Sequence, residues 1–182
     1  MNYHNLTYPD MNNGEGLRVV LWLSGCSHKC KGCQNPQTWD ANSGIPFDEQ
    51  AKEELFRELD KDYISGLTLT GGDPLYETNL DGVLNLVNEI RLLFPLKSIW
   101  LYTGYVLEEI MAGITYDKNG AFFLLENNKK RYQIISQCDV VIDGRYIDEQ
   151  KNLALKWRGS RNQRVIDIEK TLQKGEILLW KD

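Results

Sequence analysis

Three cysteines lie within eight residues, at Cys26, Cys30 and Cys33, directly after the apolar run of residues 19–23. The C-x3-C-x2-C spacing places three thiols on one loop at the end of a β-rich segment. Thiolates are the ligands that zinc and iron–sulfur clusters share. An odd set of three close thiols predicts a metal or a cluster with one coordination position left open.

Zinc and a cluster are both possible interpretations of this triplet. A structural zinc site takes four protein ligands, commonly two C-x2-C pairs, and a catalytic site takes three. The sequence has no second pair, since its fourth cysteine is Cys138. His28 lies between two of the thiols, where binding of the same ion would be strained. A cubane is wider, and three thiolates can hold three of its irons and leave the fourth free. The spacing therefore favours a cluster over zinc.

A disulfide framework is the weakest interpretation of the cysteines. We expect no secretory signal at the N-terminus, and three of the four thiols are too crowded to form independent bridges. The chain has 182 residues, of which 42% are hydrophobic, and a net charge of −5. These values predict a single cytoplasmic domain over residues 1–182. The acidic charge argues against nucleic acid as a partner, and no apolar run reaches the roughly 18 residues of a membrane span.

Strand and helix patterns alternate along the chain. Four apolar, β-rich runs predict strands, and helical spacing after Asp48 and before Pro95 predicts the helices that connect them. Strands joined by helical crossovers form a parallel sheet, wound right-handed. The expected strands cover residues 17–23, 67–70, 99–102 and 140–142, with helices near 49–59, 80–93, 107–111 and 131–137, and short strands near 164–166 and 177–180.

Residues suited to chemistry follow each of the four expected strands. The carboxyl ends of parallel strands meet on one face of the sheet, where ligands bind. Each motif alone is weak, because such glycine-rich and aspartate-rich segments are commonly turns. Their shared position predicts one site, built from the cysteine loop of residues 24–35, Gly71-Gly72-Asp73-Pro74, Thr103-Gly104-Tyr105 and Asp143-Gly144-Arg145-Tyr146.

The order of these motifs resembles that of a known family. The triplet followed by a Gly-Gly-acidic motif is similar to the radical S-adenosylmethionine superfamily, and more closely to the anaerobic ribonucleoside-triphosphate reductase activating proteins. The Arg-Gly-Ser-x-Asn-Gln tail, within residues 157–166, separates that family from other glycyl-radical activases. The resemblance covers nearly the whole chain through Asn13-Gly14-Glu15-Gly16-Leu17-Arg18, Ser24-Gly25-Cys26, His28, Cys30-Lys31-Gly32-Cys33, Asn35, Thr38-Trp39, Gly71-Gly72-Asp73-Pro74-Leu75, Trp100, Thr103-Gly104-Tyr105, Ile142-Asp143-Gly144, Trp157-Arg158-Gly159-Ser160 and Asn162-Gln163.

This resemblance implies a fold and a reaction. The fold would be a partial, open (β/α) barrel with parallel strands inside and helices outside. Cys26, Cys30 and Cys33 would hold one [4Fe-4S] cluster, whose free iron binds S-adenosylmethionine. Reduced by a flavodoxin-type electron donor, the cluster would cleave S-adenosylmethionine to methionine and a 5'-deoxyadenosyl radical. That radical would take a hydrogen atom from a glycine of the large reductase subunit.

The resemblance also implies roles for residues outside the triplet. Asp73 would bind the methionine ammonium, with Gly71 and Gly72 allowing close approach of the backbone. Asp143 would bind the ribose hydroxyls, although a β-turn aspartate is an equally good interpretation. Further cofactor contacts are expected from Gly32, Thr103, Arg158 and Ser160, and partner contacts from Gly14, Gly16 and Arg18.

Several alternatives stay open. The tail of residues 158–163 either reaches the cofactor or the partner, or is a loop held by its own hydrogen bonds. We expect His28 to be exposed on its loop and Cys138 to be a small core residue. The stretch of about residues 113–130 looks like a long insertion, with a hairpin turn at Asn119-Gly120. The competing functions are a radical enzyme that modifies a small molecule and a zinc or redox-sensing module without enzymatic activity.

Two positions depart from the family pattern. Gly14-Glu15-Gly16 stands where Gly-Pro-Gly is common, and Gln34 stands where an aromatic residue is frequent. The first departure affects how stiffly this loop would contact a partner.

Overall fold

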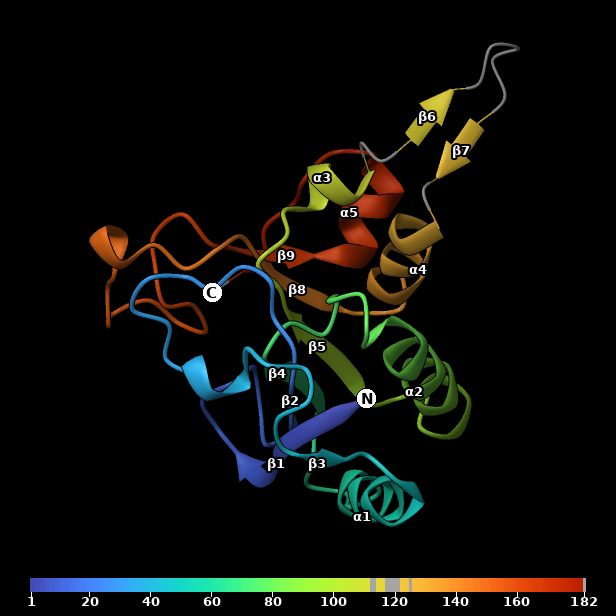
Figure 1. Cartoon of the computed structure of the whole chain (residues 1–182). Helices are drawn as coiled ribbons and strands as arrows, with labels where there is room; N and C mark the ends of the chain where they lie inside the picture. Colours follow the sequence, from blue (N-terminus) through green and yellow to red (C-terminus); the bar gives the residue numbers. More distant parts are fainter. Residues whose placement is uncertain (112–113, 117–121, 125, 182) are drawn as a thin grey trace.

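A seven-stranded sheet forms the centre of the molecule, in the order β3-β1-β2-β4-β5-β8-β9 (Figure 1). The structure is a computed structural model that describes residues 1–111, 114–116, 122–124 and 126–181. The four central strands are parallel to one another, as the sequence predicts. They are β2 (Arg18–Leu23), β4 (Gly66–Gly71), β5 (Ser98–Tyr102) and β8 (Val140–Asp143).

Antiparallel strands extend the sheet at both edges. On one side lie β1 (Asn2–Asp10) and β3 (Ile45–Pro46), and on the other lies β9 (Arg164–Asp167). The mixed α/β class and the parallel core are therefore confirmed. A barrel is not confirmed, because the strand order describes an open sheet that ends at β3 and β9.

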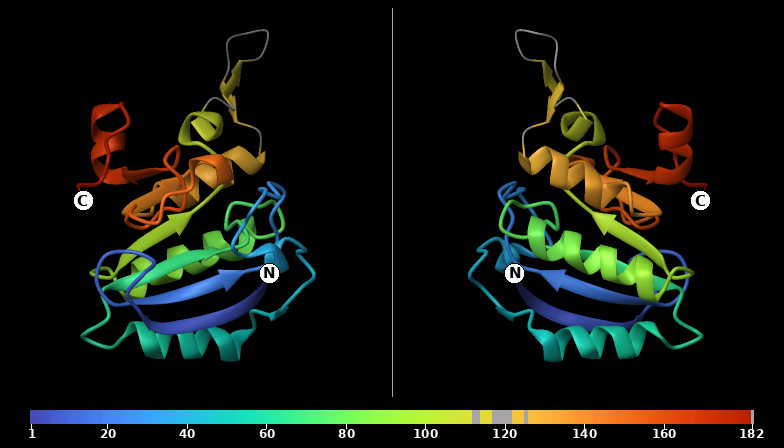
Figure 2. Two further views of the ribbon diagram at one scale, coloured as in Figure 1. Left: turned by 90° about the vertical axis from the view of Figure 1, so that its left-hand side faces the viewer. Right: turned by 90° about the vertical axis from the view of Figure 1, so that its right-hand side faces the viewer.

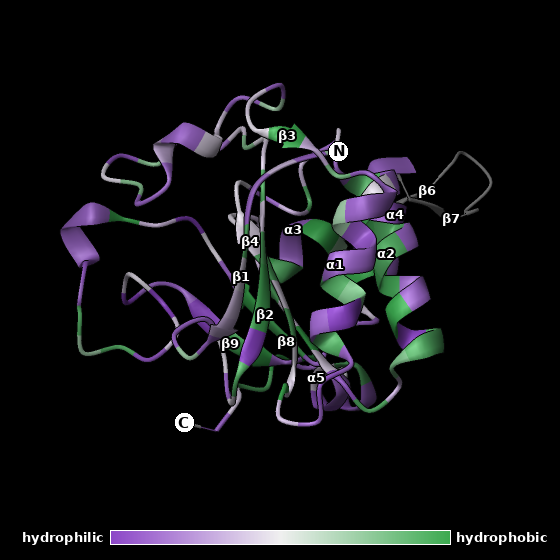
Figure 3. Cartoon of the chain, turned by 90° about the horizontal axis from the view of Figure 1, so that it is seen from below, coloured by the Kyte–Doolittle hydropathy of each residue, from purple (hydrophilic) through white to green (hydrophobic). Residues whose placement is uncertain are grey.

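Helices α1 (Glu49–Leu59), α2 (Leu80–Leu93) and α4 (Glu126–Ile135) cover one face of the sheet, as seen in Figures 2 and 3. Helix α1 begins where the sequence predicts, since the Asp48 carboxylate accepts a hydrogen bond from the Ala51 amide at 3.0 Å. The short helices α3 (Leu107–Met111) and α5 (Ile168–Lys174) follow β5 and β9. Within the described residues, no helix is both long and apolar enough to cross a membrane.

Successive side chains along each strand point to opposite faces of the sheet, so the buried apolar residues form two clusters, one on each face. In β2, Val19, Leu21 and Leu23 are fully buried in the larger cluster, which includes the apolar stripes of α1 and α2. The opposite face of the sheet carries a smaller cluster around the buried Trp100, against which Trp157 and Trp180 pack. Figure 3 shows loops and short helical turns, rather than long helices, on this second face.

Two predicted elements differ from the structure, and the edge strand β1 was not predicted. Helix α4 begins at Glu126, five residues before the predicted start. The sequence pattern did not indicate these residues as helical, because the first turns are polar and carry no apolar stripe. Residues 177–180 form only an isolated bridge between Leu179 and Ile166. The sequence reasoning missed β1, whose half-exposed, polar segment lacks the apolar run by which the buried strands were recognised.

The expected insertion contains a two-stranded hairpin. Strand β6 (Ile114–Tyr116) pairs in antiparallel fashion with β7 (Phe122–Leu124), in agreement with the hairpin prediction. The predicted turn at Asn119-Gly120 lies outside the described residues. The last five residues of the expected insertion, 126–130, belong to helix α4.

Candidate functional site

A cavity of about 120 Å³ lies at the carboxyl ends of the four parallel strands. Its walls come from the loops after β2, β4, β5 and β8, so the structure brings the four sequence motifs together. The contributing residues include Cys26, Cys30, Cys33, Gly71, Gly72, Asp73, Thr103, Gly104, Gly144 and Tyr146. We call this cavity the thiol cavity.

The loop that carries the three thiols is irregular but anchored at both ends. The Gly25 amide donates to the Thr38 carbonyl at 2.7 Å, and the Cys26 amide donates to the Trp39 carbonyl at 3.0 Å. These bonds clamp the loop against the short 3-10 helix η1 (Pro36–Thr38). Inside the loop, the Cys33 amide donates to the Cys30 carbonyl at 3.1 Å, which turns the two sulfur-bearing residues toward the same cavity.

The arrangement of the thiols fits a cluster better than a single ion. All three cysteines line the thiol cavity, yet within the described ranges no three His, Cys, Asp or Glu side chains gather around one ion position. Thiolates bound to separate irons of a cubane lie farther apart than ligands of one zinc ion. The indole nitrogen of Trp39, another wall residue, is buried without a partner in the described part of the chain.

Burial favours the protonated form of two of these thiols, those of Cys26 and Cys30. It raises the pKa of Cys26 to about 11, and the nearby negative charge of Asp73 contributes to this rise. Burial also raises the pKa of Cys30. Since metal ligands bind as thiolates, assembly of a cluster here must release protons.

Asp73 joins three of the four loops. Its carboxylate is buried and accepts hydrogen bonds from the amides of Leu75 at 2.8 Å and Gly104 at 2.9 Å. The Thr103 hydroxyl lies within 3.0 Å of both carboxylate oxygens. Asp73 therefore supports the site through contacts within the chain. Its oxygens could accept hydrogen bonds from a ligand only in addition to those that they already accept from the protein.

The side chain of His28 is buried, so the prediction of an exposed histidine is wrong. Only 4% of its side chain is exposed, and its Nε2 atom lies 2.9 Å from the nearer Asp73 oxygen. That contact lacks hydrogen-bond alignment, because Nε2 has no hydrogen-bond partner within the described residues. The ring stacks edge-on against Tyr105, with centroids 4.7 Å apart. A Cβ on Gly104 would lie 2.2 Å from the His28 ring, so the close packing of this ring requires glycine at position 104.

Arg131 of α4 holds the same loops from behind and was missed by the sequence reasoning. It donates to the Leu75 carbonyl at 2.9 Å and to the Tyr105 hydroxyl at 3.0 Å. Its guanidinium also lies 4.4 Å from the centre of the Tyr105 ring. A basic residue in a polar stretch gives no signal of such a role, because the contacts depend on how α4 packs against the strand ends.

Asp143 is directed away from the thiol cavity. Arg164 donates to its two oxygens at 2.9 and 2.5 Å, and the Leu107 amide donates at 3.0 Å. Arg164 also pairs with Glu108 at 2.6 and 2.7 Å, which lowers the pKa of Glu108 to about 2. The carboxylate of Asp143 thus ties β8 to β9 and α3, and the expected ribose contact has no support from this arrangement.

The Arg-Gly-Ser-x-Asn-Gln tail is held largely by its own hydrogen bonds. The Gln163 side-chain oxygen accepts from the Gly159 and Ser160 amides, and its amide nitrogen donates to the Gly144 carbonyl at 3.0 Å. Ser160 is fully buried, and its hydroxyl accepts from the Ile147 amide at 3.2 Å. Of the expected cofactor contacts in this tail, Arg158 is a wall residue of a cavity.

The segment expected to contact a partner is packed from within by Arg18. This side chain is fully buried and donates to the Thr68 hydroxyl at 2.6 Å and the Glu15 carbonyl at 3.1 Å. Burial lowers its pKa to about 10. Gly14 has a φ of 138°, and a Cβ there would lie 2.6 Å from Arg18, while Gly16 and Gly32 also have positive φ values. Any partner contact here would come from the loop surface, with Arg18 as its support.

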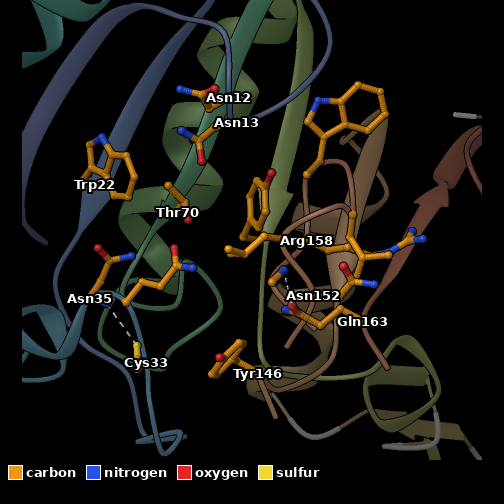
Figure 4. A pocket seen from close by; sticks show the side chains of 16 residues that line it. Asn12, Asn13, Trp22, Cys33, Asn35, Thr70, Tyr146, Asn152, Arg158 and Gln163 are labelled. Atoms are coloured by element: carbon orange, nitrogen blue, oxygen red, sulfur yellow. Dashed lines mark hydrogen bonds between the residues drawn. The ribbon is translucent and has the colours of Figure 1, made fainter. Parts of the chain in front are cut away.

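A second cavity of about 400 Å³ adjoins the first on the loop-covered face of the sheet (Figure 4). The two cavities share Cys33, Tyr102, Tyr146 and Gln163 as wall residues. We call it the amide cavity, because Asn and Gln side chains recur along its walls. The sequence reasoning did not find it, since its walls come from loops that are distant in sequence.

Comparisons with known proteins agree with this site. Residues 12–166 match the family described as 4Fe-4S single cluster domain. The anaerobic ribonucleoside-triphosphate reductase-activating protein of Enterobacteria phage T4 is 44% identical over 167 residues, or 91% of this chain and 93% of the relative. The proteins of the same name from Escherichia coli K12 and Vibrio cholerae are each 38% identical, covering 91% and 90% of this chain and 97% and 96% of their own lengths.

Proposed function

The chain belongs to the family of anaerobic ribonucleoside-triphosphate reductase-activating proteins, and we propose that it generates the glycyl radical of such a reductase. The observation that carries this proposal is the thiol cavity, where three cysteines from one loop face the glycine-rich ends of the neighbouring strands. The fold would be the open part-barrel of radical S-adenosylmethionine enzymes, with the loop-covered face of the sheet as its inside.

Cys26, Cys30 and Cys33 would hold a [4Fe-4S] cluster. When bound, the cluster supplies one electron that cleaves S-adenosylmethionine to methionine and a 5'-deoxyadenosyl radical, and it leaves one iron for the cosubstrate. The clamp between Cys26 and Trp39 fixes the loop, and Asp73 aligns it with the loops that follow β4 and β5.

The chain's own residues would position the cosubstrate beside this cluster. Gly71 and Gly72 bring backbone to the cavity wall without side chains, and Asp73 and Thr103, which are hydrogen-bonded to each other, line the same wall. The reductant would be a flavodoxin-type protein, and both proteins would act in the cytoplasm.

The reacting glycine lies on another polypeptide, so it must approach within a few ångströms of the cosubstrate. Holding two reactants in this geometry supplies much of the rate, provided that water is excluded. The loop surface around Gly14 and Gly16 and the strand-end loops would form the docking face.

Electron paramagnetic resonance tests this proposal. The reduced protein, S-adenosylmethionine and an anaerobic reductase are mixed without oxygen, and we expect a glycyl radical doublet on the reductase. A reductase with that glycine changed to alanine is the matched control and should give no doublet. Consumption of S-adenosylmethionine without a doublet, together with modification of a small molecule, would instead establish the competing small-molecule enzyme.

A further inference from the structure

The amide cavity has an unusual lining for a chain in which 26% of the residues are charged. Among the described residues that form its walls, Arg158 alone carries a charged side chain. Six wall residues are carboxamides, and they come from three separate loops. They are Asn12, Asn13, Gln34, Asn35, Asn152 and Gln163.

Most of these carboxamides keep free hydrogen-bonding groups. In the described part of the chain, the side chains of Asn12, Gln34 and Asn35 make no hydrogen bonds within the protein. Asn152 uses only its oxygen, which accepts from the Ala154 amide at 2.9 Å. Asn13 uses only its nitrogen, which donates to Asp10 at 3.0 Å. Each free carboxamide can act as donor and as acceptor.

The free carboxamides lie on opposite walls of the cavity. Figure 4 shows Asn12, Asn13 and Asn35 on the side of Trp22, with Asn152 across from them. An extended peptide directs its N–H and C=O groups alternately to its two sides, so paired walls of donors and acceptors match its main chain. A slot of this kind recognises the peptide groups and places few demands on the side chains.

We propose that the amide cavity binds the glycine-bearing segment of the reductase in an extended conformation, through its peptide groups. This inference rests on the proposed function and adds how the substrate is recognised. The shared walls support it, because a segment in the amide cavity ends against Cys33 and Tyr146, which also line the thiol cavity. The glycine Cα would then face the bound cosubstrate directly.

Binding measurements with the whole reductase test this inference. We expect the double variant Asn12→Leu, Asn152→Leu to weaken the anaerobic complex about tenfold, since each side chain contributes one or two hydrogen bonds. Asn152→Asp keeps the side-chain oxygen that accepts from the Ala154 amide, and this bond preserves the loop conformation. The substitution removes the free N–H donor and should weaken the complex about threefold. Asn42→Leu, an exposed loop residue outside the amide cavity, is the matched control.

Two further measurements distinguish this inference from its alternatives. Alanine replacements of the reductase residues on either side of the glycine should change the affinity by less than about threefold. The Asn variants should keep the parent's iron content and its affinity for S-adenosylmethionine. An equal loss of S-adenosylmethionine affinity would assign the cavity to the cosubstrate and overturn the inference.

Other results would also overturn it. Unchanged reductase binding in the Asn variants would show that the segment does not lie there, and a dominant effect of the flanking side chains would show that recognition is not by the main chain. Absence of a glycyl radical with the parent protein is a separate result, because it contradicts the proposed function before any variant is compared.

Discussion

At the residue scale, Asp73 connects the loops of the site through a buried carboxylate. Its two oxygens accept from two backbone amides and a hydroxyl, and His28 lies against them. The carboxylate ties the loop after β4 to the loop after β5, and the Asp73 amide donates to the Gly25 carbonyl of the cysteine loop at 2.7 Å. The sequence identified Asp73 from its place after a predicted strand, but the contacts with His28 depend on the folded loop.

Replacement of Asp73 by asparagine should destabilise the protein by about 1 to 3 kcal/mol. The asparagine NH2 group would face a backbone donor in a buried position, which leaves one N–H unpaired. Urea unfolding of the protein gives this difference directly. Asp40→Asn, an exposed loop aspartate, should change the free energy of unfolding by less than about 0.5 kcal/mol. Equal effects of the two substitutions would contradict the role assigned to Asp73.

At the element scale, the sequence predicted the buried strands and the amphipathic helices well. The apolar residues of these elements follow the period of a strand or a helix, so the pattern can be recognised without knowing what the element packs against, as in β2 and α2. The edge strand β1 and the first turns of α4 were missed because their stability comes from neighbours rather than from their own pattern. The network of Glu108, Asp143 and Arg164 was unpredictable for the same reason, since it joins three elements that are distant in sequence.

Glu108→Gln should destabilise the protein by about 0.5 to 1 kcal/mol at pH 7. The effect is modest because 57% of the Glu108 side chain is exposed, so solvent screens its ion pair with Arg164. Arg164 lowers the pKa of Glu108 from 4.5 to about 2, so the folded protein binds fewer protons than the unfolded chain between these values. The stabilisation is therefore complete above about pH 4.5 and is lost as the pH falls toward 2.

Unfolding of parent and variant from pH 7 to pH 3 measures this dependence. The difference between them should shrink below about pH 4.5. Glu53→Gln, an exposed position on α1, serves as the control and should show little difference at any pH. A difference for Glu108→Gln that stays constant across this range would contradict the ion pair as its cause.

At the scale of the whole molecule, the parallel sheet determines where the chemistry can occur. Four loops meet at the carboxyl ends of β2, β4, β5 and β8, and the sequence predicted this meeting from topology alone. The second cavity could not be predicted, because its walls combine the loop after β1 with the tail before β9. Because the two cavities adjoin, a cluster bound in the first would lie next to a peptide bound in the second.

The central claim is that exactly three thiolates hold a cluster with one free iron, and Mössbauer spectroscopy of iron-57-loaded protein tests it most directly. We predict three irons that are alike and one that is distinct, and only the distinct iron should change when S-adenosylmethionine is added. Cys138→Ala should give the same spectrum, since Cys138 is buried in the core and its Sγ donates to the Ile134 carbonyl. Four equivalent irons that do not respond to S-adenosylmethionine, or loss of iron in the Cys138 variant, would contradict the account.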